Sequence, residues 1–181
     1  KGRNVTCARL VVDHRPGKSD PNGTRLTVGG NPLSFEGDLH TETTDPMSIK
    51  MSLNSALSTE GAKFMTLDTK NFHLGTPMDV FECMKTKHDL IPQETKDKCD
   101  PQEKVTDDGH VHAETRKGMC GLKQAGALAN NQLEKFLKQD GHVKTNFTPG
   151  LWKHKTRPMM FNSCVDDFGV LCAGREHAEH L

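Results

Sequence analysis

The sequence predicts a mixed α/β (α+β) fold in which a small antiparallel sheet is backed by helices. Two segments carry apolar residues at the spacing of an α-helix, and several short apolar runs have the length and composition of β-strands. The chain has 181 residues, 33% of them hydrophobic, which is enough for one ordinary core or for two small lobes that share one.

The first part of the chain predicts a strand, a loop-rich span and a helix. Residues 8–13 read as a strand, and Gly, Pro, Asn and Asp punctuate residues 16–32 as they do turns and loops. Asp45 and Pro46 have the pattern of an N-cap and the first helical position. The helix that follows is expected to end at Gly61 and to present one apolar face, formed by Ile49, Leu53, Ala56 and Leu57.

In the middle of the chain, the sequence predicts a strand that ends in an aspartate, followed by an irregular insertion. Residues 64–67 are an apolar run that ends in Asp68. Residues 79–108 are acidic and show little periodicity, so we expect an irregular insertion closed by a turn at residues 107–109.

The last part predicts a second helix and a β-hairpin. The helix spans about residues 124–139, is capped by Gly141, and has an apolar face formed by Ala129, Leu133, Phe136 and Leu137. Two strand-like runs, residues 159–165 and 168–173, are separated only by two aspartates, which is the spacing of a two-residue hairpin turn.

The aspartates of this hairpin are candidate metal ligands. Asp166 and Asp167 stand between apolar strands, so we expect two carboxylates at the tip of a partly buried hairpin, where a divalent cation would supply the counter-charge. Asp68 would complete an oxygen-only site suited to Mg²⁺ and to two-metal phosphoryl transfer. An ordinary turn is the alternative, and it is the interpretation for the other pair, Asp107 and Asp108.

The charges are unevenly distributed although their formal sum is zero. Residues 76–115 hold ten acidic and five basic residues, whereas residues 116–158 hold nine basic and two acidic ones. The second stretch predicts either a solvated surface or a face that contacts phosphates. Trp152 and Phe147 could stack on bases beside it, with core packing as the alternative for Trp152. The candidate nucleic-acid contacts are Lys117, Lys123, Lys153, Lys155 and Arg157.

The composition argues against other classes of protein. Six cysteines occur without a CxxC pair or zinc-type spacing, and no stretch approaches the roughly 20 apolar residues of a membrane span. The chain does not begin with Met and opens close to a strand, so we expect a fragment of a longer, intracellular and non-secreted protein.

Four segments resemble, in order and spacing, the motifs of the reverse transcriptases of LTR retrotransposons (Ty1/copia-like Pol polyproteins). They are RLVVDHRPGK (residues 9–18), FMTLDTKNFHLGTPM (64–78), RKGMCGLKQAG (116–126) and CVDDFGV (164–170). The resemblance implies a reverse-transcriptase domain whose fingers comprise about residues 1–45 and 76–123 and whose palm comprises about residues 46–75 and 124–181, with the thumb missing.

The resemblance also implies the chemistry. RNA-directed DNA polymerisation would use Mg²⁺ or Mn²⁺ held by Asp68, Asp166 and Asp167, and the primer 3′-hydroxyl would attack the α-phosphate of a dNTP. By the same resemblance, nucleotide binding falls to Arg9, His73 and Gln124. The implied partners are dNTPs, a primed RNA or DNA template and other parts of a Pol polyprotein, without a membrane, in the cytoplasm, a virus-like particle or the nucleus.

The sequence contains no tyrosine, which is unusual for this length. His73, Cys120, Cys164 and His110 or His112 stand where similar sequences carry an aromatic residue. This pattern favours an alternative: a decayed, catalytically inactive copy that binds nucleic acid at most weakly. It also predicts marginal folding, because lost phenol rings leave cavities. A third alternative is an unrelated metalloprotein that uses histidines such as His110 and His112.

Overall fold

The computed structural model describes residues 4–17, 19–99 and 104–179, and Lys18 of the first motif lies outside these ranges. The fold is mixed α+β, with two sheets and four α-helices in the part described. Backbone contacts divide the chain into two compact units: residues 1–38 with 73–125, and residues 39–72 with 126–181. Each unit is therefore built from two separate segments of the chain.

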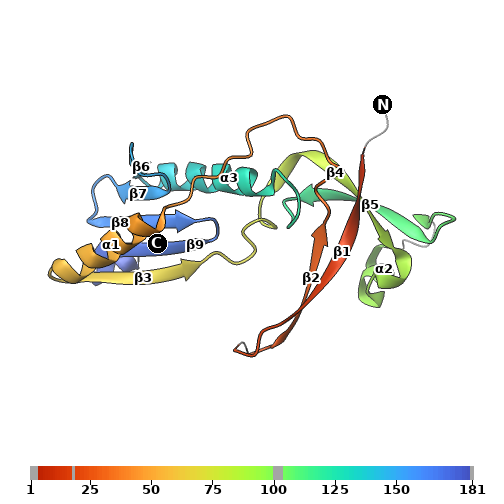
Figure 1. Cartoon of the computed structure of the whole chain (residues 1–181), viewed down its shortest axis with the longest axis horizontal. Helices are drawn as coiled ribbons and strands as arrows, with labels where there is room; N and C mark the ends of the chain where they lie inside the picture. Colours follow the sequence, from red (N-terminus) through yellow and green to blue (C-terminus); the bar gives the residue numbers. More distant parts are fainter. Residues whose placement is uncertain (1–3, 18, 100–103, 180–181) are drawn as a thin grey trace. The chain divides into compact units, whose positions relative to one another are not determined.

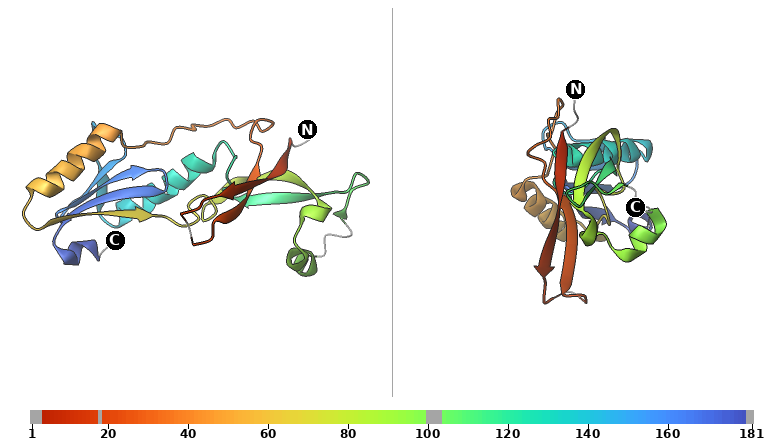
Figure 2. Two further views of the ribbon diagram at one scale, coloured as in Figure 1. Left: turned by 60° about the horizontal axis from the view of Figure 1, so that its bottom comes forward. Right: turned by 90° about the vertical axis from the view of Figure 1, so that its right-hand side faces the viewer.

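The first unit contains a four-stranded mixed sheet of order β2-β1-β4-β5. β1 (Val5–His14) and β2 (Asn22–Val28) form the long antiparallel ribbon drawn in red in Figures 1 and 2. β4 (Pro77–Lys87) pairs in parallel with β1 and antiparallel with β5 (His110–Lys117). The short 3-10 turn η1 (His88–Leu90) and helix α2 (Gln93–Cys99) follow β4.

The prediction of an irregular insertion over residues 79–108 was wrong, because much of this segment is β4, η1 and α2. β4 escaped detection because it is only partly covered: Val80 is 69% and Phe81 37% exposed, so no alternation marks the strand. α2 buries none of its side chains and is instead stabilised locally, by Gln93–Asp97 and Glu94–Lys98 contacts one turn apart.

The second unit contains a five-stranded antiparallel sheet of order β3-β9-β8-β7-β6. Figure 1 shows these strands side by side. Their bounds are β3 (Ala62–Asp68), β6 (His142–Lys144), β7 (Leu151–His154), β8 (Met159–Cys164) and β9 (Asp167–Ala173), and the short helix α4 (Arg175–Ala178) follows.

One face of this sheet packs against helix α3 (Ala125–Gln139). The core on this side consists of Trp152, Phe161, Phe168 and Val170, and Leu133 and Leu137 of α3 are packed against it. Burial of Trp152, which is 2% exposed and stacked on Phe161, rules out its role as a surface platform for bases. Phe136 is 58% exposed, so its assignment to the apolar face of α3 was wrong.

The opposite face carries helix α1 (Pro46–Ser58), which begins as predicted. The Asp45 carboxylate accepts the backbone N–H groups of Met47 and Ser48, and the Ser48 hydroxyl hydrogen bond lowers the pKa of Asp45 further. The side chain that α1 buries is Ser52, whose hydroxyl lies 3.4 Å from the Oδ1 atom of Asn162. The predicted apolar face is therefore not fully used, since Leu57 is 88% exposed.

Candidate functional site

The β8–β9 hairpin and β3 place the three candidate aspartates on adjacent backbone positions. Asp68, the last residue of β3, lies directly opposite Asp167, the first residue of β9. Asp166 occupies the hairpin turn, and its carbonyl oxygen accepts the backbone N–H of Thr69 at 2.9 Å. Side chains at opposed positions of antiparallel strands begin about 5 Å apart, so the Asp68 and Asp167 carboxylates can reach a common ion.

The hairpin turn differs by one residue from the predicted one. Cys164 pairs with Asp167, so the two loop residues are Val165 and Asp166, and Asp167 belongs to β9. Val165 has a φ of 60°, a conformation that β-branched residues rarely adopt. Backbone strain of this kind clusters at functional sites, where the surrounding structure enforces it.

The aspartate side chains are accessible to solvent. Asp68 and Asp167 are exposed and Asp166 is half-buried, so the expectation that burial makes a counter-ion necessary was wrong. Within the described part of the chain, no Lys, Arg or His nitrogen lies within 4.0 Å of these carboxylates. Three carboxylates without cationic partners suit a hard divalent ion such as Mg²⁺.

An apolar cavity of about 440 Å³ adjoins these carboxylates. Asp68, Asp167 and Cys164 line one part of it, and Ile49 and Leu53 of α1 line another. The carboxylate end of this sheet therefore combines acidic groups with an apolar wall.

The residues predicted to bind nucleotide lie in the first unit. Arg9 pairs with Thr27 across the β1–β2 ribbon and is exposed, whereas His73 is half-buried. Gln124 is only 2% exposed, and its amide nitrogen donates to the Glu82 carboxylate at 2.9 Å. The Gln124 side chain thus has a structural partner within its own unit.

The basic stretch is divided between the two units. Lys117 and Lys123 belong to the first unit, where the Lys123 ammonium donates to the carbonyl oxygen of Leu33 at 2.9 Å. Lys153, Lys155 and Arg157 belong to the second, on β7 and the turn after it. The sequence could not reveal this division, because the basic residues follow one another without an interruption in composition.

Among the described residues, Asp140, His142 and His154 form a group of three side chains of metal-ligating type whose potential ligand atoms all lie within 4.8 Å of one another. They are neither the three aspartates nor His110 and His112. The sequence analysis missed this group because it did not predict β6 and β7, the two strands on which His142 and His154 are directly opposed.

Hydrogen bonding argues against this group as a metal site. Nδ1 of His154 accepts the backbone N–H groups of Thr156 at 3.2 Å and Arg157 at 3.1 Å, which places the ring proton on Nε2. Nε2 then donates to the carbonyl oxygen of Asp140 at 3.0 Å. Because the single lone pair of the neutral ring is already engaged, His154 cannot bind an ion in this arrangement.

Comparison with known proteins adds no assignment: no family matches the chain, and no curated protein is significantly similar to it. No helix in the described part of the chain is long and apolar enough to cross a membrane.

Proposed function

We propose that the chain is a fingers-and-palm fragment of an LTR-retrotransposon reverse transcriptase of the copia type, an RNA-directed DNA polymerase. The observation that carries the proposal is the register of the second sheet, in which Asp68 ends β3 opposite Asp167. Asp166 lies beside them in a turn with a strained Val165. The four motifs that resemble the family supply the identity of the chemistry, and the three-dimensional arrangement is compatible with it.

In this proposal Asp68, Asp166 and Asp167 would hold two Mg²⁺ ions, and the chemistry that the ions would supply is a lower pKa of the primer 3′-hydroxyl and stabilisation of the charge on the phosphates. The three carboxylates are the donors that the protein would supply, and water molecules and the dNTP phosphates would complete the octahedral coordination of each Mg²⁺ ion. The protein positions them through backbone pairing of β3, β8 and β9, so that the side chains need only rotate to meet the ions.

Primer extension on poly(rA)/oligo(dT) with Mg²⁺ tests the proposal. The comparison includes the chain, a longer form that adds a thumb, and the Asp166→Asn variant of each. Asp107→Asn is the matched control, since it alters the other Asp-Asp pair, which lies in an ordinary turn. Polymerase activity is supported if the longer form extends the primer, its Asp166→Asn variant does not, and its Asp107→Asn variant still does. Extension that persists in Asp166→Asn contradicts it.

A second candidate is an inactive remnant of the same element that binds nucleic acid weakly. Two observations favour it: the aspartate side chains do not form a closed group of ligand atoms, and the Gln124 amide is engaged by Glu82. Such a remnant shows no extension in either folded form. Its affinity for nucleic acid falls with salt and is indifferent to Mg²⁺ and to Asp166→Asn.

A further inference from the structure

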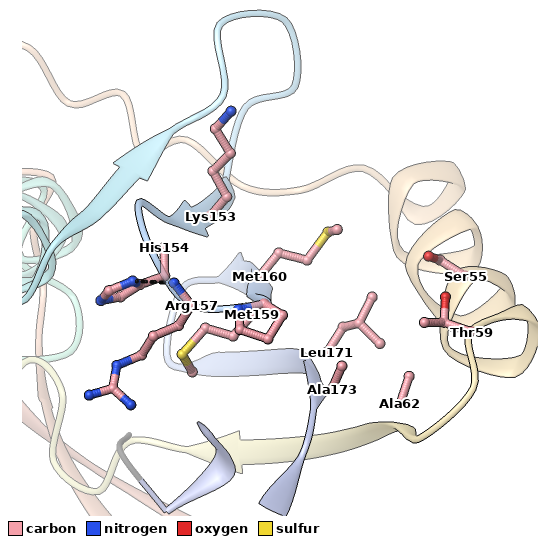
Figure 3. A pocket seen from close by; sticks show the side chains of 11 residues that line it. Ser55, Thr59, Ala62, Lys153, His154, Arg157, Met159, Met160, Leu171 and Ala173 are labelled. Atoms are coloured by element: carbon pink, nitrogen blue, oxygen red, sulfur yellow. Dashed lines mark hydrogen bonds between the residues drawn. The ribbon is translucent and has the colours of Figure 1, made fainter. Parts of the chain in front are cut away.

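The cavity beside Arg157, of about 330 Å³, lies within the second unit. Met160 and Leu171 form an apolar part of its lining, and Lys153 and Arg157 are its two cations (Figure 3). The Lys153 and Arg157 side chains extend in opposite directions, so they do not converge on one anionic group. An edge of the sheet in the first unit offers a more specific arrangement.

The edge of β1 that faces away from β2 is open along most of the strand. β4 pairs with β1 only through Val5, Thr6 and Cys7. Beyond them, no strand in the described part of the chain pairs with residues 8–14 on this side, and Figure 1 shows the β1–β2 ribbon continuing past β4. Residues 8–14 therefore present a row of backbone groups with which another strand can pair.

The hydrogen bonds between β1 and β2 show which residues face this open edge. The carbonyl oxygen of Cys7 accepts the Gly29 N–H at 3.2 Å, and the Arg15 N–H donates to the carbonyl oxygen of Pro21 at 2.7 Å. Alternate residues of an antiparallel strand bond to the same neighbour, so the odd-numbered residues from 7 to 15 face β2. The N–H and C=O groups that point to the open edge belong to the even-numbered residues: Ala8, Leu10, Val12 and His14.

One face of this segment is apolar and exposed. Leu10 and Val12 are 47% and 79% exposed, and they lie on the same face because side chains alternate along a strand. Leu26 of β2, 45% exposed, lies directly opposite Leu10. The apolar face thus reaches the open edge without a cover in its own sheet.

The other face carries opposite charges four residues apart. Arg9 is exposed, and within the described residues no carboxylate oxygen lies within 4.0 Å of its side-chain nitrogens. Asp13 is half-buried and forms an ion pair with Arg15, just after β1. Val11, midway between Arg9 and Asp13, is 46% exposed. Such a strand complements a second copy of itself, because antiparallel pairing about Val11 opposes each Arg9 with an Asp13.

We propose that the chain forms a symmetric dimer in which the open edge of β1 pairs with the same edge of a second copy, antiparallel, about a two-fold axis at Val11. The contact uses the same surface on both copies, so it closes at two chains. Arg9 of each copy then lies opposite Asp13 of the other. The outward-facing residues are opposed in pairs, each of which exchanges two backbone hydrogen bonds: Ala8 with His14, and Leu10 with Val12.

Hydrogen bonding and charge select this register over its neighbours. A shift by one residue opposes outward-facing with inward-facing residues and forfeits the backbone hydrogen bonds. A shift by two residues places Arg9 opposite Arg15 in one direction and opposite Val11 in the other, and parallel pairing in register places Arg9 beside Arg9. Like charges in opposed positions are destabilising, and of these arrangements the one centred on Val11 gives Arg9 an acid.

The outer edge of β2 lacks this self-complementarity. Arg25 is the single charged residue of β2, so no symmetric pairing of this strand can oppose unlike charges. At the end of β2, the Val28 N–H already donates to the carbonyl oxygen of Cys120 at 3.0 Å. The edge of β1 is therefore the better surface for a second copy.

Pairing through one strand makes a small interface. Leu26 and Leu10 of one copy continue on the apolar face into Val12 of the other, which adds side-chain contacts to the backbone hydrogen bonds. The interface is nevertheless smaller than that of a permanent dimer, so we expect a dissociation constant of roughly 1–100 μM. The inference does not depend on the proposed polymerase activity.

Sedimentation velocity of the whole chain over roughly 1–300 μM tests the proposal. Arg9→Asp and Asp13→Arg should each weaken dimerisation about tenfold or more, because each opposes like charges at two places. An equimolar mixture of the two variants opposes unlike charges again at both places, so it should form a heterodimer, and the double variant should again form a homodimer. A parent chain that stays monomeric over this range overturns the inference. So does a mixture that stays monomeric although both variants retain the parent's circular dichroism.

Matched controls separate the edge from a general effect of charge. Arg25 lies on the charged face of the neighbouring strand, opposite Val11, and does not face the second copy, so Arg25→Asp should change the dissociation constant less than about threefold. Asp166→Asn should leave it unchanged, which distinguishes this inference from the polymerase proposal. Equal losses in Arg25→Asp and Arg9→Asp contradict the proposed contact.

Disulfide trapping tests the position of the axis. Val11→Cys and Val12→Cys are compared in a Cys7→Ser background, which removes the exposed thiol of β1. At the axis the two Val11 positions form a non-hydrogen-bonded pair with Cα atoms about 4.5 Å apart, which a disulfide can bridge. Mild oxidation should therefore link two Val11→Cys chains through the introduced thiols, as mapped by mass spectrometry, and link Val12→Cys chains far less. Equal yields from the two variants, or a higher yield from Val12→Cys, refute the register.

Discussion

Replacing Lys144 with Met is expected to destabilise the second unit by about 1–2 kcal/mol at pH 7. The Lys144 ammonium lies 2.8 Å from both Glu42 and Glu134 and 5.5 Å from the centre of the Trp152 ring. Met retains the apolar stem but removes two ion pairs, each worth up to about 1 kcal/mol, and a cation–π contact worth about 0.5–1 kcal/mol. Because Glu42 is partly exposed, we expect the loss of stability to lie at the lower end of the sum of these three contributions.

The effect depends on pH in a direction set by the pKa shifts. Burial alone would raise the pKa of Glu134, but hydrogen bonds from Lys138 and Lys144 outweigh it and lower the pKa below 4.5. Burial likewise opposes the raised pKa of Lys144, which its hydrogen bonds to Glu134 and Glu42 produce. The Glu134 contribution is therefore full above about pH 5 and is lost as the pH falls through its folded pKa. The contribution of Lys144 to stability is full below about pH 10.5, its ordinary pKa, and is lost only as the pH rises through its raised folded pKa.

Urea unfolding followed by Trp152 fluorescence measures this effect, because Trp152 is the single tryptophan of the chain and lies in the second unit. We expect the difference between the chain and Lys144→Met to shrink from pH 7 to pH 3. Lys138→Met is the control: Lys138 also contacts Glu134 but is 59% exposed, so the loss is below about 0.5 kcal/mol. A Lys144→Met chain as stable as the parent at pH 7, or an undiminished difference at pH 3, would refute the reasoning.

Three other substitutions test the packing and the strain of the second unit. Phe161→Ala removes a 2%-exposed ring that contacts Trp152 and Phe168, and urea unfolding should show a loss of about 3–5 kcal/mol. Gly150→Ala places a methyl group 2.4 Å from the backbone nitrogen of Thr44 at a φ of 73°, so the thermal midpoint should fall by several degrees; an unchanged midpoint contradicts the close approach. Val165→Asn tolerates the positive φ better and should stabilise the hairpin by about 1 kcal/mol; a loss of stability would show that Val165 is not strained.

Local signals in the sequence were sufficient for several elements. The Asp45–Pro46 pair correctly marked the start of α1, because a side-chain cap and a proline act within a few residues. The hairpin was also predicted, although its turn was misplaced by one residue. The choice between Val165 and Asp167 as a loop residue depends on cross-strand hydrogen bonds, which composition does not encode.

Features set by distant partners were not predictable. β4 is a strand because β1 and β5 flank it, and its exposed Val80 and Phe81 conceal the usual alternation. Leu57 fits the helical periodicity of α1, yet the sheet beneath that helix meets Ser52 instead. The cavity beside Arg157 likewise combines residues of β3, α1, β7, β8 and β9, so no continuous motif could mark it.

The pairing of β3 with β9 has a consequence for synthesis on the ribosome. Ala62 pairs with Ala173 and Asp68 with Asp167, so β3 emerges long before β9, the strand beside it in the sheet as described, has been translated. During that delay its backbone donors and acceptors form an unsatisfied edge, which another nascent chain can pair with. We therefore expect chaperones that hold extended segments to influence the yield of soluble chain more than its final stability does. A contact of such high sequence separation also makes slow folding the expected behaviour.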